Sequence, residues 1–82
     1  MLKQQSTRDA INDGLIMARV RTALAADPIT ADYEITVISF DGVVELSGFA
    51  DTATVRAEAL QLAQHVEGVL RVQDSLDLRR FD

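Results

Sequence analysis

The chain has 82 residues, 48% of them hydrophobic and only four of them glycine, which is typical of one small ordered domain rather than a disordered segment. It contains no cysteine, which excludes disulfides and thiolate metal sites. Its net charge of −5 argues against general nucleic-acid binding, and it has no run of about 18 or more apolar residues that would span a bilayer.

Residues 1–10 are polar and lack a clear period, so we expect a flexible N-terminal segment followed by a single domain at 11–82. This segment lacks the apolar stretch of a signal peptide. Two compartments remain open from the sequence. The chain is either a mature periplasmic region whose signal was removed, or it is cytoplasmic.

The first helix is predicted to begin after Asp13, whose carboxylate suits an N-cap, and to run over 14–26. Asp27 and Pro28 should end it, because the residue before a proline disfavours the helical region. The apolar residues expected to face the core recur at helical spacing: Ile16, Val20, Ala23 and Leu24.

Another face of this helix carries Leu15, Arg19 and Thr22. An apolar side chain beside an arginine suits a lipid surface, because a guanidinium binds a phosphate bidentately and its aliphatic stem tolerates the interface. These residues are our candidate lipid-binding site. The alternative is an ordinary solvated helix face.

The centre of the chain is a predicted β-hairpin. Two β-rich runs, 34–40 and 43–49, flank Asp41 and Gly42, and an Asp-Gly pair favours the type I′ turn with positive φ at both positions. Alternation directs one set of apolar residues toward the helices: Ile35, Val37, Val44 and Leu46.

The opposite face of the hairpin carries Ile38, Phe40 and Val43. Two helices cover only one face of a small sheet, so this apolar face is expected to be open and is our candidate partner-binding surface. The competing explanation is that the twist of the sheet buries part of it.

A second helix is predicted to start at Asp51 or Thr52, either of which suits an N-cap, and to end at Gly68 in the left-handed C′ position. Its core-facing residues are spaced as one stripe: Val55, Ala59, Leu62, Ala63 and Val66.

Residues 69–78 alternate as a third strand, with Val72, Leu76 and Leu78 inward and Asp74 interrupting the pattern at a bulge or an edge. The order α-β-β-α-β predicts an α+β fold, because a strand–helix–strand crossover makes its two strands parallel. We therefore expect a three-stranded mixed sheet with two helices packed on one face.

Two motifs at this separation, Gly-Val-Val-x-Leu-Ser-Gly at 42–48 and Gly-Val-x-x-Val at 68–72, resemble the BON domain of bacterial osmotically inducible and nodulation proteins. The resemblance covers about residues 11–78 and implies an αββαβ fold. It also implies a periplasmic envelope protein that supports the envelope under osmotic stress without enzymatic activity. Its implied partners are anionic phospholipid surfaces or an envelope protein. The alternative is an interaction or oligomerisation module, forming a weak homo-oligomer or part of a larger or cytosolic assembly.

Residues with catalytic or metal-binding chemistry are sparse. His65 is the only histidine, so a His- or Cys-based nucleophile–base pair lacks its parts, and the position suits a helix C-terminus. Asp27 with Asp32, or Asp74 with Asp77, falls short of the ligand density of a calcium loop. We expect no catalytic site, no metal and no cofactor.

Overall fold

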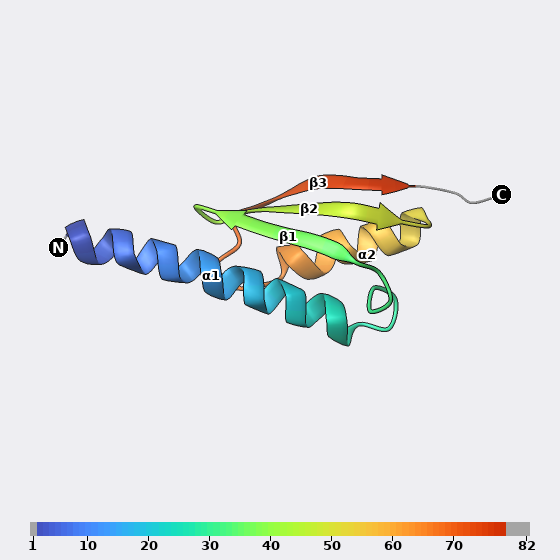
Figure 1. Cartoon of the computed structure of the whole chain (residues 1–82), viewed down its shortest axis with the longest axis horizontal. Helices are drawn as coiled ribbons and strands as arrows, with labels where there is room; N and C mark the ends of the chain where they lie inside the picture. Colours follow the sequence, from blue (N-terminus) through green and yellow to red (C-terminus); the bar gives the residue numbers. More distant parts are fainter. Residues whose placement is uncertain (1, 79–82) are drawn as a thin grey trace.

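The structure is a computed structural model that describes residues 2–78, with side chains described for residues 12–78. The elements follow the predicted order: α1 (Leu2–Ala26), β1 (Ile35–Phe40), β2 (Val43–Ala50), α2 (Ala53–Gln64) and β3 (Arg71–Leu78) (Figure 1). The predicted α+β fold is confirmed.

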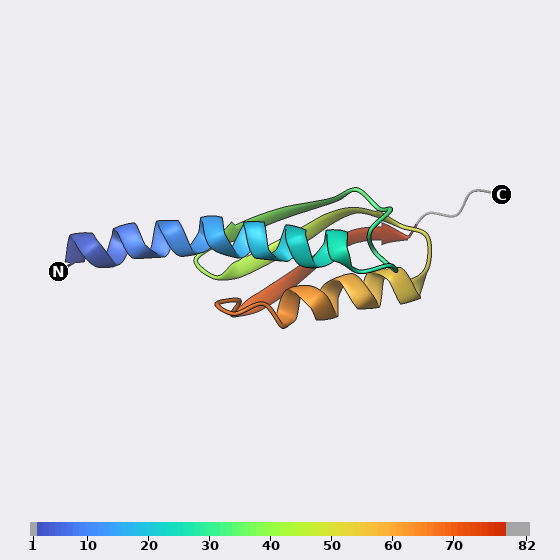
Figure 2. The ribbon, with the colours of Figure 1, turned by 90° about the horizontal axis from the view of Figure 1, so that it is seen from below.

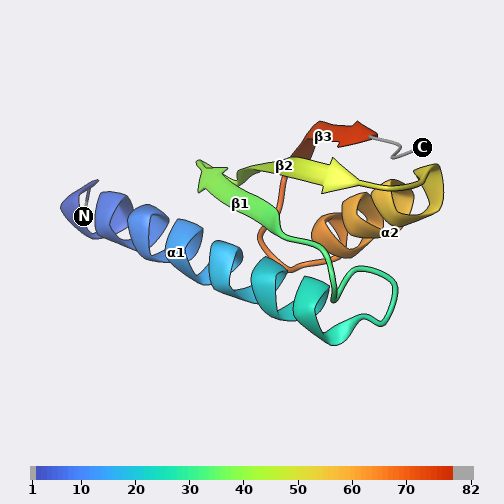
Figure 3. The same cartoon turned by 45° about the vertical axis from the view of Figure 1, so that its right-hand side comes forward.

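The three strands form one sheet in the order β1-β2-β3, with β2 in the centre. β1 pairs with β2 antiparallel through the hairpin, and β3 pairs with β2 parallel after the α2 crossover. Both helices lie on the same side of the sheet, with α1 along β1 and α2 along β3, and within residues 2–78 no helix covers the other side (Figures 1 and 3).

The core lies between the central strand and the two helices. Val20 of α1 and Val44 and Leu46 of β2 are fully buried, as are two of the alanines of α2, Ala59 and Ala63. Alanines at these positions bring α2 close to the sheet because they carry no side chain beyond Cβ. The predicted inward set on the hairpin is confirmed, with Ile35 at its margin half-buried.

Helix α1 begins at Leu2, twelve residues before the predicted start at residue 14, so the prediction that Asp13 is an N-cap is wrong. The N-terminal half of α1 extends beyond the end of the sheet, which gives the molecule its elongated shape (Figures 1 and 2). The backbone of residues 2–10 is thus helical, while the domain boundary at residue 11 stays a prediction.

The end of α1 is satisfied by the loop that follows it. The hydroxyl of buried Thr30 donates to the carbonyl oxygen of Leu24 at 2.7 Å, and the N–H of Ile29 donates to Oδ1 of Asp27 at 2.8 Å. The carbonyl oxygen of Leu24 is one of the groups that a helix C-terminus leaves without a helical partner, and the Asp27 bond orders the loop that brings Thr30 to it. The predicted end of the helix at residue 26, before Asp27 and Pro28, is confirmed, since α1 ends at Ala26.

Helix α2 begins as predicted, with Thr52 as its N-cap: the Thr52 hydroxyl accepts from the N–H of Val55 at 3.3 Å. Its predicted end at Gly68 is wrong, because His65 is the C-cap. Gly68, with φ +98°, instead lies in the following turn, where its missing Cβ lets the backbone pass the side chain of Ile16.

Asp74 lies on an edge strand, one of the two placements predicted for it. It occupies an inward position of β3, and its carboxylate accepts from Nε of Arg56 on α2 at 2.6 Å. The inward position is therefore used for an ion pair between β3 and α2.

Two glycines give a matched test of the fold. Gly48 lies inside β2 with φ +126°, and a Cβ there would stand 2.7 Å from the carbonyl oxygen of Glu34. We expect Gly48→Ala to destabilise the fold by about 1–3 kcal/mol, because it adds strain at a conformation that L-residues avoid. Chemical denaturation would measure this.

Gly14→Ala is the control. A Cβ at Gly14 meets nothing within 4 Å, and alanine in a helix is more favourable than glycine by roughly 1 kcal/mol. We expect this variant to be slightly more stable than the parent. Equal stability changes in the two variants would contradict the strain assigned to Gly48.

Candidate functional site

The carboxylate of Asp13 joins α1 to the tip of the β1–β2 hairpin. Its Oδ1 accepts from the hydroxyl of Ser39 at 2.8 Å and from the N–H of Gly42 at 3.1 Å, and its Oδ2 accepts from the N–H of Asp41 at 2.8 Å. The turn has positive φ at Asp41 (51°) and Gly42 (82°), as predicted for type I′. The carboxylate thus holds both central amides of the turn.

These three donors lower the pKa of Asp13 from its ordinary value, the Gly42 N–H contributing most, then the Ser39 hydroxyl and the Asp41 N–H. The same turn is bound on its other side by the α2–β3 connection, since the N–H of Leu70 donates to the carbonyl oxygen of Gly42 at 2.8 Å. The hairpin tip is therefore fixed from both sides.

Loss of the Asp13 charge should destabilise the fold in a pH-dependent way. A lowered pKa in the folded state means that the carboxylate stabilises the fold above its unfolded pKa, and that this contribution is lost as the pH falls through the folded pKa. We expect Asp13→Asn to lower the thermal midpoint at neutral pH and to converge with the parent in acid.

Thermal unfolding by circular dichroism, repeated from neutral pH down through the carboxylate range, would measure this difference. Asp32→Asn controls for the loss of one negative charge at an exposed residue of the α1–β1 loop. A constant difference between Asp13→Asn and the parent at every pH would contradict a role for the charge.

The candidate lipid-binding residues lie together on one flank of α1. Leu15 is 45% exposed, and Arg19 and Thr22 are also exposed. Leu15 and Arg19 line a depression of about 270 Å³ whose far wall is the turn at Glu67 and Gly68. The structure thus places an apolar and a cationic side chain side by side on an accessible surface.

The candidate partner-binding residues lie on the sheet face opposite the helices. Ile38 is 51% exposed and Phe40 is 73% exposed, while Val43 is half-buried. All three line a depression of about 390 Å³, together with Glu45 and Gln73 of the neighbouring strands. The predicted apolar face is therefore accessible, and the sheet twist does not cover Ile38 or Phe40.

Leu70 was missed by the sequence reasoning. It is 80% exposed and lies against Gly42 at the hairpin tip. Simple alternation in the predicted strand 69–78 assigns Leu70 to the inward set, but β3 begins only at Arg71. Alternation alone does not show that the strand starts at Arg71, directly after the apolar pair Val69 and Leu70.

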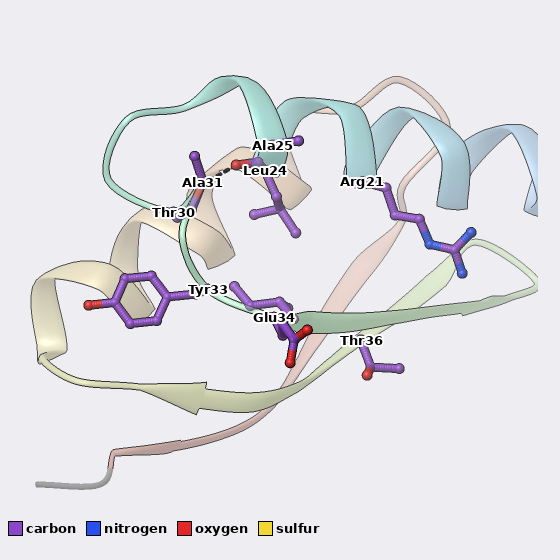
Figure 4. Close-up of a pocket in the computed structure, with 9 residues that line it drawn as sticks. Arg21, Leu24, Ala25, Thr30, Ala31, Tyr33, Glu34 and Thr36 are labelled. Carbon is purple, nitrogen blue, oxygen red and sulfur yellow. Dashed lines mark hydrogen bonds between the residues drawn. The ribbon is translucent and has the colours of Figure 1, made fainter. Parts of the chain in front are cut away.

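A second feature that was not predicted is a pocket of about 460 Å³ between the end of α1, the loop after it and the start of β1 (Figure 4). Arg21, Tyr33, Glu34 and Thr36 contribute its polar groups. The Tyr33 hydroxyl donates to Oδ2 of Asp51 at 3.2 Å, and burial chiefly raises the pKa of Tyr33. The pocket is open beside the outer edge of β1.

Two of the four aspartates weighed as cation ligands, Asp27 and Asp74, have other partners. The carboxylate of Asp27 accepts from the N–H of Ile29, and its interaction with Glu58 lowers the pKa of Asp27 and raises that of Glu58. Asp74 binds Arg56. Among the described side chains, no cluster of three or more possible ligands surrounds a metal position. No described helix has the length and apolar character needed to cross a membrane.

Comparison with known proteins gives two findings. The family model described as the BON domain matches residues 12–80 of the chain. Over 69 residues the chain is 36% identical to Osmotically-inducible protein Y of Escherichia coli (strain K12). The match covers 84% of this chain but 34% of that protein, so the chain spans about a third of its relative's length.

Proposed function

The chain belongs to the BON domain family, and on that premise we propose that it is a non-enzymatic module of the bacterial envelope that binds anionic phospholipid surfaces. We place it in the periplasm, where it supports the envelope under osmotic stress. Similarity to an osmotically inducible protein supports the stress role.

The observation that carries lipid binding is the exposed flank of α1 with Leu15, Arg19 and Thr22. Among the described side chains the one ion pair joins Arg56 to Asp74, so the Arg19 guanidinium is available to an external anion. Leu15 lies one helical turn from Arg19 and offers apolar contact beside the phosphate.

Electrostatics limits the strength and range of this attraction. The chain carries a net charge of −5, so the molecule as a whole is repelled by an anionic membrane. Attraction through Arg19 acts within a Debye length of about 8 Å at physiological ionic strength. Binding should therefore be peripheral, local to this flank and sensitive to salt.

Arg19→Gln should weaken binding to anionic vesicles several-fold, because it removes the cation that faces the phosphates. Arg21→Gln is the matched control: Arg21 is also exposed on α1 but lines the pocket on the other flank. Co-sedimentation with phosphatidylglycerol-containing and purely zwitterionic vesicles, at low and moderate salt, would measure the difference.

Equal binding losses in the two variants would contradict a site at Leu15, Arg19 and Thr22. An absence of binding by the folded parent chain to either vesicle would contradict lipid binding itself. NMR titration adds a residue-level readout, with shifts expected to cluster at Leu15, Arg19 and Thr22.

The runner-up function is protein interaction through the open sheet face, which the exposure of Ile38 and Phe40 favours. A partner protein would bury these side chains and Val43 in the depression that they line.

Phe40→Ser tests this alternative, because Phe40 is 73% exposed and its truncation leaves the core intact. We expect the variant to keep its fold by circular dichroism and to lose self-association, measured by sedimentation. Unchanged association would exclude the open face as the contact.

A further inference from the structure

The depression on the open sheet face combines apolar side chains with negative charge. Ile38, Phe40 and Val43 form its apolar part, at the end of the sheet next to the hairpin turn (Figure 1). Its charged groups are the carboxylates of Asp41 and Glu45, and none of the described residues that line it is a lysine or an arginine. The volume of about 390 Å³ falls within the range of small-ligand sites, roughly 300–1,000 Å³. The depression can therefore take one or two side chains of a partner, and it is acidic.

Glu45 stands on the central strand β2 in the middle of this face. It is half-buried, and its neighbours in the strand register are Ile38 of β1 and Gln73 of β3. Its Oε2 accepts from the hydroxyl of Ser75 on β3 at 2.9 Å, which holds the side chain across the sheet. A carboxylate has about four acceptor sites, and Ser75 is the one side-chain donor that reaches it within the described part of the chain. Oε1 of Glu45 is therefore available to a donor on a partner.

No cation in residues 12–78 forms an ion pair with Glu45, because the one ion pair of that range joins α2 to β3 on the side of the helices. Arg71 is the cation closest to Glu45 in the strand register, but it pairs with Val43 and lies outside the lining of the depression. Unlike charges attract more strongly at a partly buried site than in water, since the effective dielectric constant is lower. Glu45 is thus suited to recognise a cation on a partner.

We propose that this depression binds an extended peptide segment of a partner protein that carries an apolar residue and, two residues away, a lysine or an arginine. In an extended chain such residues point to the same side, about 6.7 Å apart. The apolar side chain packs on Phe40 and Val43, and the basic side chain donates to Glu45. The proposal rests on the protein-interaction function of the open sheet face, and it names the chemistry of the partner.

Charge complementarity favours this partner over the other occupants of the face. A basic segment is attracted by Asp41 and Glu45 and by the net charge of −5 on the whole chain. The same carboxylates repel an anionic membrane. Two copies of the chain would bring like carboxylates together, so self-association through this face is weak and a basic segment competes with it.

The acidic depression is separate from the lipid-binding flank. Leu15 and Arg19 line a depression between α1 and the turn at Glu67, on the helix side of the sheet. Glu45 lies on the side that the helices leave open (Figure 3). The two surfaces therefore select ligands of opposite charge, and each can be tested while the other is intact.

NMR titration with capped pentapeptides tests the proposal. The probe is acetyl-Leu-Ser-Lys-Ser-Leu-amide, whose lysine and two leucines lie on one side when it is extended. Its controls carry glutamine or glutamate in place of the lysine. We expect the lysine peptide, at millimolar concentration, to give saturable shifts clustered at residues 38–45 and at Gln73. Binding should be about fivefold weaker for the glutamine peptide, in line with a partly exposed ion pair, and should be lost for the glutamate peptide.

Two matched variants locate the charge that matters. Glu45→Gln keeps an acceptor for the Ser75 hydroxyl and should bind the lysine peptide about fivefold more weakly than the parent. Asp77→Asn is the control, because Asp77 is also an exposed carboxylate of the same face but pairs with Phe49, outside the depression. We expect Asp77→Asn to bind like the parent. Circular dichroism checks that both variants fold.

Equal binding of the lysine and glutamine peptides would overturn the proposal, as would equal effects of Glu45→Gln and Asp77→Asn. If Phe40→Ser abolishes peptide binding and Glu45→Gln does not, the open face is an interaction surface whose partner is apolar rather than basic. If neither variant changes binding, the contact lies elsewhere and the protein-interaction function of this face fails with the proposal. Shifts at residues 38–45 that follow protein concentration and ignore every peptide would assign the face to a second copy instead.

Discussion

The fold depends on one carboxylate that holds a hairpin turn. Asp13 accepts hydrogen bonds from Ser39, Asp41 and Gly42, at distances between 2.8 and 3.1 Å. In the same turn, the carbonyl oxygen of Gly42 accepts a hydrogen bond from the N–H of Leu70, the residue before β3. The first helix, the hairpin and the α2–β3 connection therefore meet at this turn, and the position of α1 on the sheet follows from it.

Much of this fold could be predicted because it follows from local rules. The Asp41-Gly42 turn needs positive φ, and both residues have it. Alternation then assigned Val37 and Leu46 to the core and Phe40 to the open face, as observed. The N-cap at Thr52 and the parallel pairing of β3 with β2 follow from equally general preferences.

The errors concern interactions between residues far apart in the sequence. Asp13 was predicted to cap its own helix, but its bonds go to residues 26 to 29 positions away, which no local pattern reports. Gly68 was assigned to a helix cap, whereas the side chain of Ile16 accounts for its close packing. The pocket beside Tyr33 likewise joins α1, a loop and β1, and so becomes visible only once the chain is folded.

In the candidate sites, too, local patterns predict some features, and other features depend on residues far apart in the sequence. That Leu15, Arg19 and Thr22 lie on one helix face follows from periodicity, and that Ile38 and Phe40 lie on one sheet face follows from alternation. The turn at Glu67 that walls the first site, and the exposed Leu70 beside the hairpin tip, depend on how the crossover returns to the sheet.

The central position of β2 has a consequence for the order in which the chain folds. Its pairing with β1 closes a two-residue loop, whereas its pairing with β3 joins Val43 to Arg71 across the whole of α2. Closing the longer loop costs more chain entropy, so the hairpin forms early and β3 arrives late. Until β3 pairs, the side of β2 opposite β1 has no strand beside it, and the folding chain is most prone to mispairing in that interval.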